Sequence, residues 1–542
     1  MAFSSEGTVH RSTVTGTKGM VSSAHPLATL AGLRILLAGG NAFDAIVAVA
    51  AALNVAEPYM SGIAGVGYAL LYNAKEERIR TLDYCGRTPH RATPEAFSKG
   101  GLQEGGVTSC LVPGACGGWL ALHEKYGRMD LSSVFAPAIE LAEDGFAVTV
   151  KNAKFIQDAE SRMRPSGARV IQSRGRSPEP GEVLVQPDLA RTFKRVVEGG
   201  TEAFYRGDIG QEIVSFVEAE GGLLNAQDLE DFEVEWQDPI STTYRGYDVF
   251  SPPLPSAGVQ ILETLNILED YDVKGLGHHS EESLHLFLEA CKIANVDRVQ
   301  YAAAEDPPLE MLLSKSYAAS RRELIGDQAS ISRGEYFMAS KLPGEIEPGK
   351  PGDWLNDCTT HFDVVDGEGN AIAITQSLGS GFGSGAILGE TGMFLNNFIH
   401  WADLVPDSPN CIRPHKKIDM CLSPIQVFRE GNLVSALGTP GSWGIQQTTT
   451  QFLTNYLDYG MNIQAAIEAP RFRFQNPGTG VYMETRIPEN IRQALENRGH
   501  QIDLVGDWSP VAGGAQGITV DAETGTLMGG ADPRRDGYAL GI

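Results

Sequence analysis

The chain has 542 residues and a formal net charge of −25 at neutral pH, which argues against binding to polyanions. With 42% hydrophobic and 20% charged residues, it has the composition of a folded globular protein rather than a disordered one. The excess of Asp and Glu repels nucleic-acid backbones and anionic membrane surfaces, so we expect neither as a partner.

The cysteines and the N-terminal segment favour a cytoplasmic location. Seven cysteines are scattered without a C-x-x-C pair, which favours neither a disulfide framework nor a zinc site. The first residues lack an apolar signal-peptide core, and the apolar run from Ala42 to Ala56 contains Asp44 and is too short to span a membrane. Eleven dispersed histidines predict no metal site, and no cofactor motif is found.

Residues 25–57 predict two consecutive helices. HPLATLAGLRILLAGG is typical of a helix that ends at Gly39 and Gly40, and Asn41 is placed to cap a second helix, AFDAIVAVAAALNVA, that ends before Pro58. The second helix is apolar nearly all round, so we expect other layers to cover it on several sides. GYALLYN and RIRTLDY then predict strands.

The middle of the chain is mainly helical in its pattern. Residues 130–230 are polar with helical periodicity. A basic Gly/Pro-rich stretch at 164–182 interrupts this pattern and predicts a surface loop. TYRGYDVFSPPLPSAG predicts a strand that runs into a proline-rich turn, and SEESLHLFLEACKIANVDRVQYAAAEDPP predicts a long helix. Residues 326–357, rich in Gly, Pro and charge, predict a mobile tail. The mixture indicates an α+β sandwich with sheets inside and helices outside.

The stretch NDCTTHFDVVDGEGNAIAITQS, residues 356–377, predicts a β-hairpin with two apolar arms. If residues 367–369 form its turn, Thr359 on the first arm faces Ser377 on the second. Directly opposed residues have Cβ atoms about 4.5–5.5 Å apart, close enough for the two hydroxyls to form a hydrogen bond.

A threonine at the start of a chain can act as a nucleophile with its own α-amine as the base. That role requires the chain to be cut between Cys358 and Thr359. The predicted mobile tail would give access to this bond, and the Thr359 hydroxyl could attack the preceding carbonyl. From these residues alone, the alternative is a threonine that is present for its β-propensity.

A series of motifs extends over nearly the whole chain in a fixed order. They are MVSSAHPLATLAGLRILLAGGNAFDAIVAVAAALNVAEPYMSGIAGVG, LVQPDLARTF, GTEAFYRGDIG, GGLLNAQDLEDFEVEW, TYRGYDVFSPPLPSAG, TTHFDVVDGEGNAIAITQSL, FGSG, GMFLNNF and LGTPGSWG. Together they resemble the γ-glutamyltranspeptidase family of N-terminal nucleophile hydrolases. The resemblance implies a proenzyme with a four-layer αββα sandwich. It also implies self-cleavage before Thr359, which gives segments 1–358 and 359–542 that remain associated.

The resemblance further implies roles around this nucleophile. Ser377 falls on the hydroxyl that supports the nucleophile, which is usually a threonine in the family, and the hairpin register reaches the same residue independently. Gly441 and Ser442 fall on the Gly-Gly pair of the family's G-[ST]-P-G-G turn, whose backbone amides bind the oxyanion. Because backbone groups do this work, a serine at the second position is tolerated.

The polar residues that recognise glutamate in the family are replaced at six positions of this chain. These positions are Cys85, Gly379, Phe398, Trp401, Met420 and Cys421. Burying an unpaired ammonium or carboxylate costs several kcal/mol, so we expect free α-amino acids to bind poorly.

The replacements predict an apolar pocket wall. Phe398, Trp401 and Met420, with Trp443, would suit apolar or flat acyl groups, and the alternative is that these aromatics fill core space beside an altered pocket. Arg87, two residues beyond Cys85, remains able to contact an acidic group.

We therefore predict an N-terminal threonine amidohydrolase or acylase with a small-molecule amide substrate other than glutathione. Family members that lack the glutamate site in a similar way include acylases of β-lactam side chains and hydrolases of small amides such as oxamate. Two alternatives stay open. One is a true γ-glutamyl hydrolase or transferase, a glutathione hydrolase, whose substrate head group is held by Arg87 and other residues. The other is an unprocessed, non-catalytic binding homologue.

Overall fold

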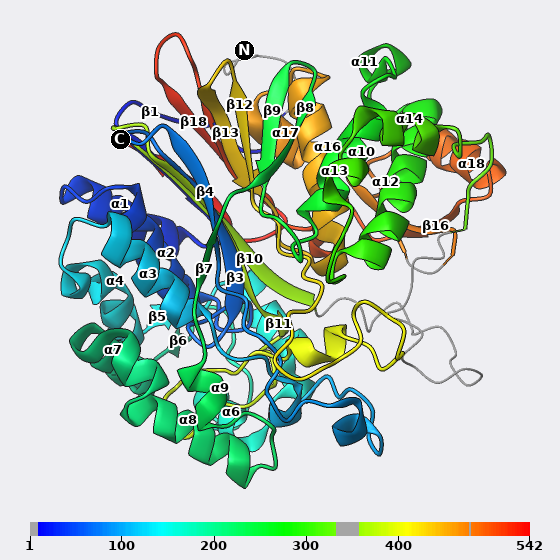
Figure 1. The fold of residues 1–542 in the computed structure, drawn as a ribbon. Helices are drawn as coiled ribbons and strands as arrows, with labels where there is room; N and C mark the ends of the chain where they lie inside the picture. The colour runs from blue at the N-terminus through cyan, green and yellow to red at the C-terminus, as the bar shows by residue number, and fades with distance from the viewer. Residues whose placement is uncertain (1–8, 332–356, 476–477) are drawn as a thin grey trace.

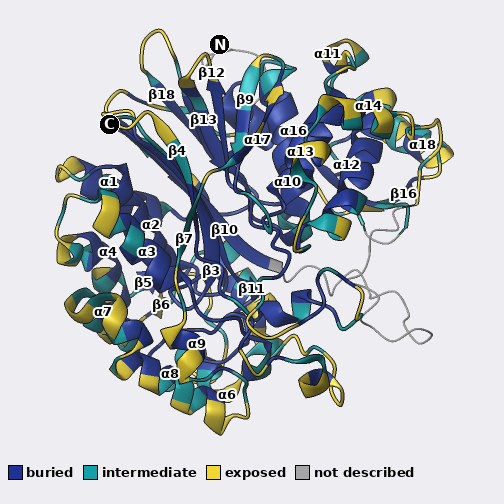
Figure 2. Ribbon diagram, in the orientation of Figure 1, coloured by how far each residue is buried: buried dark blue, intermediate teal, exposed yellow. Residues whose placement is uncertain are grey.

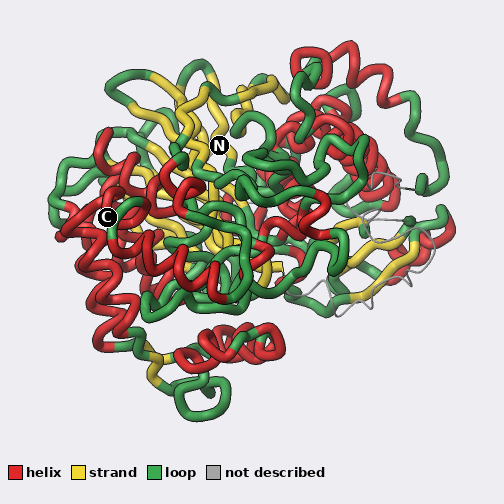
Figure 3. The backbone as a smooth tube through the Cα atoms, turned by 60° about the horizontal axis from the view of Figure 1, so that its bottom comes forward, coloured by secondary structure: helices red, strands yellow, loops and turns green. Residues whose placement is uncertain are grey.

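Two seven-stranded antiparallel sheets form the centre of the protein, and helices cover both of their outer faces (Figure 1). The computed structural model describes residues 9–331, 357–475 and 478–542. Seen from another direction in Figure 3, helices again lie on either side of the strands. The predicted αββα sandwich is therefore confirmed.

The first sheet contains the predicted hairpin. Its strand order is β19 (Tyr538–Gly541), β2 (Gly19–Ser23), β10 (Asp357–Asp366), β11 (Ala371–Ser380), β3 (Val66–Asn73), β4 (Arg78–Asp83) and β7 (Glu235–Gln237). The hairpin strands β10 and β11 lie in the middle, where β2 and β3 pair with their outer edges. The hairpin is thus fixed on both sides, and the predicted strands GYALLYN and RIRTLDY are β3 and β4.

The second sheet packs against β10 and β11 through β13 and β17. Its strand order is β1 (Val14–Gly16), β18 (Leu527–Ala531), β17 (Gln516–Val520), β13 (Asn432–Gly438), β12 (Ile425–Arg429), β9 (Tyr247–Ser251) and β8 (Ile240–Tyr244). The stretch TYRGYDVF, which we expected to be a single strand, is the hairpin β8–β9. It turns at Arg245 and Gly246, which both have positive φ as a two-residue hairpin turn requires.

One helical layer covers the first sheet. It contains α1 (Pro26–Leu37), α2 (Ala42–Ala56), α3 (Ala115–Tyr126), α4 (Leu131–Asp144), α7 (Pro187–Tyr205) and α8 (Asp208–Ala219). Helix α2 lies on β10 and β11, with α1, α3 and α4 around it. All of its residues are buried, as its all-round apolar sequence predicts.

Asn41 caps α2 as predicted, because its side chain accepts hydrogen bonds from the Phe43 and Asp44 amides. The first turn of the helix also holds the hairpin, since the Ala42 amide donates to Asp366 Oδ2 over 2.9 Å. A buried carboxylate at a helix N-terminus is stabilised by the free amides there. The cap therefore fixes α2 and the hairpin turn relative to each other.

The other helical layer covers the second sheet. It contains α10 (Gly258–Leu268), α12 (Glu281–Tyr301), α14 (Lys315–Arg322), α16 (Ile445–Leu457) and α17 (Ile463–Glu468). Beside it lies a small sheet, β14 (Phe472–Phe474), β15 (Gly480–Met483) and β16 (Gln501–Leu504), with α18 (Glu489–Asn497). The shorter elements are α5 (Val150–Asp158), α9 (Ala226–Glu230), α11 (Val273–Leu276), α13 (Leu309–Leu312), β5 (Phe146–Ala147) and β6 (Val183–Leu184).

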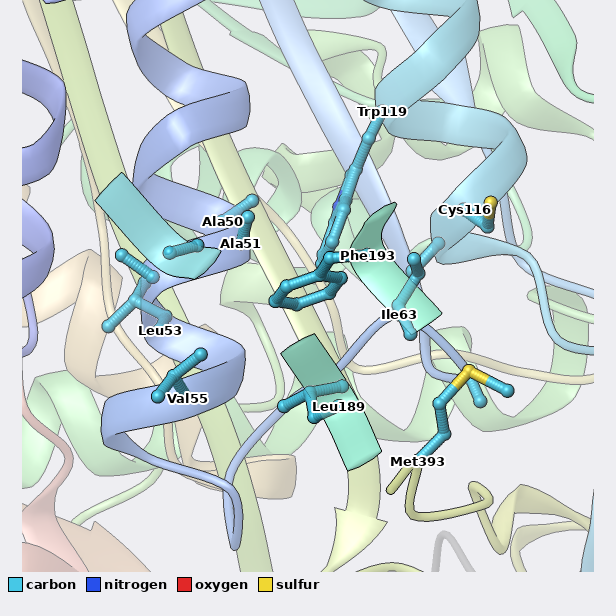
Figure 4. Close-up of a cluster of buried hydrophobic side chains, with 14 of the residues drawn as sticks. Ala50, Ala51, Leu53, Val55, Ile63, Cys116, Trp119, Leu189, Phe193 and Met393 are labelled. Atoms are coloured by element: carbon cyan, nitrogen blue, oxygen red, sulfur yellow. The ribbon is translucent and has the colours of Figure 1, made fainter. Parts of the chain in front are cut away.

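Burial is concentrated in the two sheets and in the helices next to them (Figure 2). The largest hydrophobic cluster fills the space between the first sheet and its helices, and Figure 4 shows Trp119 and Phe193 in it with Leu53 of α2. Trp119 also donates its indole N–H to Gln376 Oε1 of β11 over 2.9 Å. The core thus continues directly behind the hairpin.

Two further expectations differ from the structure. The predicted surface loop 164–182 contains a short helix, α6 (Pro165–Ile171), which begins at a proline because proline is favoured in the first helical turn. Most of the predicted mobile tail, residues 332–356, lies outside the described residues. Among the described residues, no helix has the length and apolar character that a membrane span requires.

Candidate active site

The hairpin β10–β11 has the predicted turn but not the predicted continuous register. Paired residues follow the expected order from Thr360 opposite Gln376 to Val365 opposite Ala371. The register then shifts by one residue, because Cys358 pairs with Gly379. Thr359 therefore opposes both Ser377 and Leu378 in a β-bulge whose extra residue lies on β11, so the prediction of one continuous register through Thr359 is wrong. Bulges of this kind re-aim side chains and are frequent beside active sites.

Despite the bulge, the hydroxyls of Thr359 and Ser377 lie close together. Thr359 Oγ1 donates to Ser377 Oγ over 3.4 Å, and Ser377 Oγ donates in turn to the carbonyl oxygen of Cys358. The Gly379 amide also donates to Ser377 Oγ, over 2.8 Å. A chain of hydroxyls therefore connects Thr359 with the carbonyl of the peptide bond before it.

Gly379 shapes the bulge that makes this contact. Its φ of +104° is a backbone conformation that glycine adopts without strain. A Cβ atom at this position would lie 2.1 Å from Asn397 Oδ1, so the site has no room for a side chain. Asn397 itself is fixed between the Ser380 amide and the Glu104 carbonyl. The bulge is therefore held by contacts with a distant segment.

Two buried ionisable residues, Arg535 and Glu57, contact Thr359 and Thr360. Arg535 is 2% exposed and donates to the Thr359 carbonyl over 2.8 Å. The Thr360 hydroxyl donates to Glu57 Oε2 over 3.3 Å. Burial raises the pKa of Glu57 to about 7, against the opposing effect of the Arg535 guanidinium. Sequence reasoning missed both charged residues, since neither lies in the hairpin motif.

His361 connects the hairpin with the second sheet. Its Nδ1 lies 2.8 Å from Thr375 Oγ1, and its Nε2 lies 3.1 Å from Asp363 Oδ1. Burial raises the pKa of Asp363, and the adjacent imidazole opposes that rise. β13 ends against this ring, because a Cβ atom on Gly438 would lie 2.4 Å from His361 Cε1. The T-T-H motif was the sequence signal that could have identified His361.

The turn that follows β13 carries the predicted oxyanion residues and lies against β10. Gly441 has φ of +133° and Ser442 has φ of +53°. A serine adopts this left-handed region much less readily than a glycine. This conformation gives a physical reason for the second glycine that the family has at the position of Ser442.

Five of the six altered glutamate positions and Trp443 meet in one place. Cys85, Phe398, Trp401, Met420 and Cys421 belong to a single buried hydrophobic cluster, and Trp443 packs against it. The ring centroids of Phe398 and Trp401 lie 5.1 Å apart, and those of Trp401 and Trp443 lie 5.2 Å apart. These distances are within the range of favourable aromatic pairs. The sixth altered position, Gly379, lies in the bulge.

A buried ion pair lies beside this cluster and was missed by sequence reasoning. Arg298 of α12 pairs with Asp419, and its guanidinium lies 3.9 Å from the centroid of Trp443. Gln260 and Asn295 accept further hydrogen bonds from Arg298, at 3.0 and 3.1 Å. Burial raises the pKa of Asp419 to about 6, although Arg298 opposes that rise.

Arg87 is already engaged with another charged residue. Its guanidinium lies 2.9 Å from Glu235 Oε1, and its side chain is 38% exposed. Lys417 Nζ also lies 2.9 Å from Glu235 Oε1, and it contacts the buried Asp83. The positive charge of Arg87 is therefore balanced within an ionic cluster of two cations and two carboxylates.

Comparison with known proteins places the whole chain in one family. A family model for gamma-glutamyltranspeptidase matches residues 28–542. The glutathione hydrolase-like YwrD proenzyme of Bacillus subtilis (strain 168) is 37% identical over 98% of this chain and 99% of its own length. An acylase ACY 1 proenzyme of Pseudomonas sp. (strain V22) is 36% identical over 99% of this chain and 95% of its own length.

A solved structure supports the same assignment. The crystal structure of cephalosporin acylase from Bacillus halodurans is 34% identical, has a TM-score of 0.90, and is matched over 99% of this chain and 98% of that chain. At this identity and coverage, the likeness extends beyond a shared fold. This chain belongs to the γ-glutamyltranspeptidase family of N-terminal nucleophile hydrolases and is an autoprocessed amide-bond hydrolase of that family.

Proposed function

We propose that this protein is an acylase that cleaves itself between Cys358 and Thr359 and then uses Thr359 to hydrolyse amides of apolar or flat acyl groups. The observation that supports Thr359 as the nucleophile is the chain of hydrogen bonds from its hydroxyl through Ser377 to the Cys358 carbonyl. An attacking hydroxyl and a polarised carbonyl are the two groups that self-cleavage needs.

Self-cleavage follows from this arrangement in two steps. Thr359 Oγ attacks the Cys358 carbonyl carbon and loses its proton, the carbon–nitrogen bond breaks, and the nitrogen takes up a proton to become the free α-amine of Thr359. Cys358 is then joined to Thr359 Oγ as an ester, and water hydrolyses this ester to a carboxylate and a free hydroxyl. The hydrogen bond from Ser377 to the Cys358 oxygen stabilises the charge that develops during attack.

Turnover repeats this chemistry on an external amide. The liberated α-amine of Thr359 takes the proton from Oγ as it attacks the substrate carbonyl, and it returns the proton to the leaving amine. The amides of Gly441 and Ser442 are the proposed donors to the oxyanion, and water then releases the acyl group. Ser377 supports the nucleophile in this step as well.

The buried cluster around Trp401 supports the substrate class. Where the family binds charged groups of glutamate, this chain places Cys85, Phe398, Met420 and Cys421 in apolar surroundings. Arg87, the one nearby cation from which we expected a compensating contact, is paired with Glu235. An α-carboxylate would therefore find no free guanidinium at Arg87, and an α-ammonium group would lose its water among apolar side chains, each at a cost of at least about 1–3 kcal/mol.

The processing step is tested on the purified protein with a denaturing gel, intact mass measurement and N-terminal sequencing. We expect two chains, the smaller of which begins at Thr359. Thr359→Ala should remain a single chain, whereas Thr359→Ser, which keeps the hydroxyl, should still be cut. A single uncut wild-type chain would instead favour the non-catalytic binding homologue.

The substrate class is tested with matched p-nitroanilides. The γ-glutamyl and glutaryl compounds differ only in the α-amino group, and a butyryl compound lacks the carboxylate as well. We expect kcat/KM for the glutaryl or butyryl compound to exceed that for the γ-glutamyl compound by about 10- to 100-fold, the equivalent of one unpaired buried charge. A strong preference for the γ-glutamyl compound would establish the alternative, a true γ-glutamyl hydrolase.

A further inference from the structure

A group of metal-ligating side chains lies outside the candidate active site. His90, Asp231 and His415 each offer one ligand atom, and these atoms all lie within 4.8 Å of one another. The dispersal of histidines along the sequence predicted no metal site. The fold, however, brings together residues from the segment after β4, the end of α9 and the segment before Met420.

The buried carboxylate of Asp228 fixes the tautomer of His90. Asp228 Oδ1 lies 2.7 Å from His90 Nδ1 and accepts the His90 backbone amide over 2.7 Å, while its Oδ2 accepts the Asn225 amide over 2.8 Å. Since this carboxylate oxygen only accepts, the ring proton lies on Nδ1 and the Nε2 lone pair is available. A histidine whose second nitrogen donates to a carboxylate is the usual arrangement of a metal ligand.

The Nε2 atom of His90 faces the Asp231 carboxylate. It lies 3.5 Å from Asp231 Oδ2. The His415 ring is stacked on the His90 ring with centroids 4.7 Å apart, so metal binding requires the exposed His415 ring to rotate out of the stack and turn a nitrogen towards the ion. Gln227 donates to the other oxygen of Asp231 over 2.6 Å, which holds the carboxylate in place. Ligand atoms about 2.0–2.2 Å from a tetrahedral Zn²⁺ are roughly 3.3–3.5 Å apart. His90 Nε2 and Asp231 Oδ2 would therefore need little movement to bind one ion.

The backbone around His415 is held in position opposite His90. The Thr88 amide donates to the Lys416 carbonyl over 2.9 Å, and the His415 amide donates to the Thr88 carbonyl over 3.1 Å. Thr88 Oγ1 donates to the Arg413 carbonyl over 2.5 Å and accepts the Lys416 amide over 2.9 Å. These bonds hold His415 at φ of +53°, which histidine adopts more readily than most residues.

We propose that His90 Nε2, the Asp231 carboxylate and the His415 imidazole bind a divalent transition-metal ion of the Zn²⁺ class, with water completing its coordination. Two imidazoles and one carboxylate form a ligand set that suits zinc, nickel and copper and is poor for magnesium or calcium. The three side chains are accessible to solvent, so an ion can enter without unfolding. The net negative charge of the chain also favours approach of a cation.

A second group of potential ligands makes a useful comparison. His285, Glu289 and His500 are buried and also have donor atoms within 4.8 Å of one another. There, however, the Lys292 ammonium lies 2.9 Å from Glu289 Oε1 and already neutralises the carboxylate. An entering cation would have to displace this ammonium, so the group around His285 is the weaker of the two.

The proposed metal would join both parts of the processed protein. His90 and Asp231 lie in segment 1–358, whereas His415 lies in segment 359–542. If the chain is cut as proposed above, the ion links the two products. This consequence, unlike the metal site itself, rests on the proposed function. The segment that carries His415 continues directly into Asp419 and Met420 beside the predicted pocket, so the link would also hold that segment.

The site is tested with full-length, chelator-treated protein titrated with Zn²⁺ in competition with a chromogenic indicator, and with Co²⁺ followed by visible absorption. We expect one bound equivalent. His415→Asn, which tolerates the same left-handed backbone, and Asp231→Asn should each weaken binding at least about tenfold. His10→Ala, which removes an unrelated surface imidazole, should leave the affinity unchanged.

Three results would overturn the proposal: no bound Zn²⁺ at one equivalent in the wild type, unchanged affinity in His415→Asn and Asp231→Asn, or loss of binding only in His500→Ala. Circular dichroism of each variant separates loss of a ligand from loss of the fold. Anilide hydrolysis is measured on the same samples. Protein that hydrolyses anilides without binding Zn²⁺ contradicts the metal site alone, and protein that binds Zn²⁺ without hydrolysis contradicts the proposed function alone.

Discussion

Replacement of Ser377 by alanine is the sharpest perturbation of the proposed self-cleavage. The wild-type hydroxyl, on a residue that is 1% exposed, accepts from Thr359 and the Gly379 amide and donates to the Cys358 carbonyl. Ser377→Ala removes a donor aimed at the oxygen where charge develops during attack. Loss of one such donor lowers rates about 100- to 1,000-fold, which corresponds to about 2.7–4 kcal/mol in the transition state.

The same substitution has a smaller and separable effect on folding. It leaves the buried Gly379 amide without its hydroxyl partner, at a cost of about 1–3 kcal/mol in the free energy of unfolding. The rate is measured by cell-free synthesis of the labelled precursor, followed by a time course on a denaturing gel. Thermal unfolding of the same variant shows whether the fold survives.

Two control variants sharpen this experiment. Ser380→Ala removes another buried hydroxyl of β11, which donates to Glu104 Oε1 over 2.8 Å and not to the cleavage site, so cleavage should proceed. Ser377→Thr keeps the hydroxyl and should also be cut. If Ser377→Ala were cleaved at the wild-type rate while remaining folded, the hydroxyl chain would have no part in processing.

The remaining predictions concern stability. The pKa of Glu57 is raised from its ordinary value of 4.5 to about 7 by burial, so the folded state loses stability as pH rises across that window, by about 3 kcal/mol in total. Glu57→Gln should make the melting temperature less dependent on pH within this window. A pH dependence equal to that of the wild type would contradict this. Asn41→Ala removes the cap of α2 and should lower the free energy of unfolding in urea by about 1 kcal/mol, and a neutral effect would refute the capping argument. Phe193→Ala opens a cavity in the core and should cost about 3–5 kcal/mol, whereas Phe193→Leu should cost clearly less in the same assay.

Local patterns in the sequence were sufficient for the elements that depend on neighbouring residues. The cap at Asn41, the end of α2 before Pro58 and the turn at 367–369 are set by contacts within a few positions, so periodicity and turn chemistry predict them. The order of the motifs indicated the family, and the family implied the αββα sandwich. The helix at 165–171 was missed because Gly and Pro around it are typical of loops as well as of helix ends.

Tertiary structure decided the details on which the site depends. Alternation of residues along a strand predicts a continuous register, but β11 has a bulge opposite Thr359, and Gly379 at its end packs against Asn397 of a later segment. The contact of Arg535 with the Thr359 carbonyl joins residues that lie 176 positions apart in the chain.

The sequence by itself therefore determined which residues form the hairpin, its two hydroxyls and the altered glutamate positions. Only the folded chain decided that five of those positions share one buried cluster, that Arg87 is paired with Glu235, and that His90 meets His415. The physical reason is that side-chain partners far apart in the chain are selected by packing between layers, which leaves no periodic signal along the sequence.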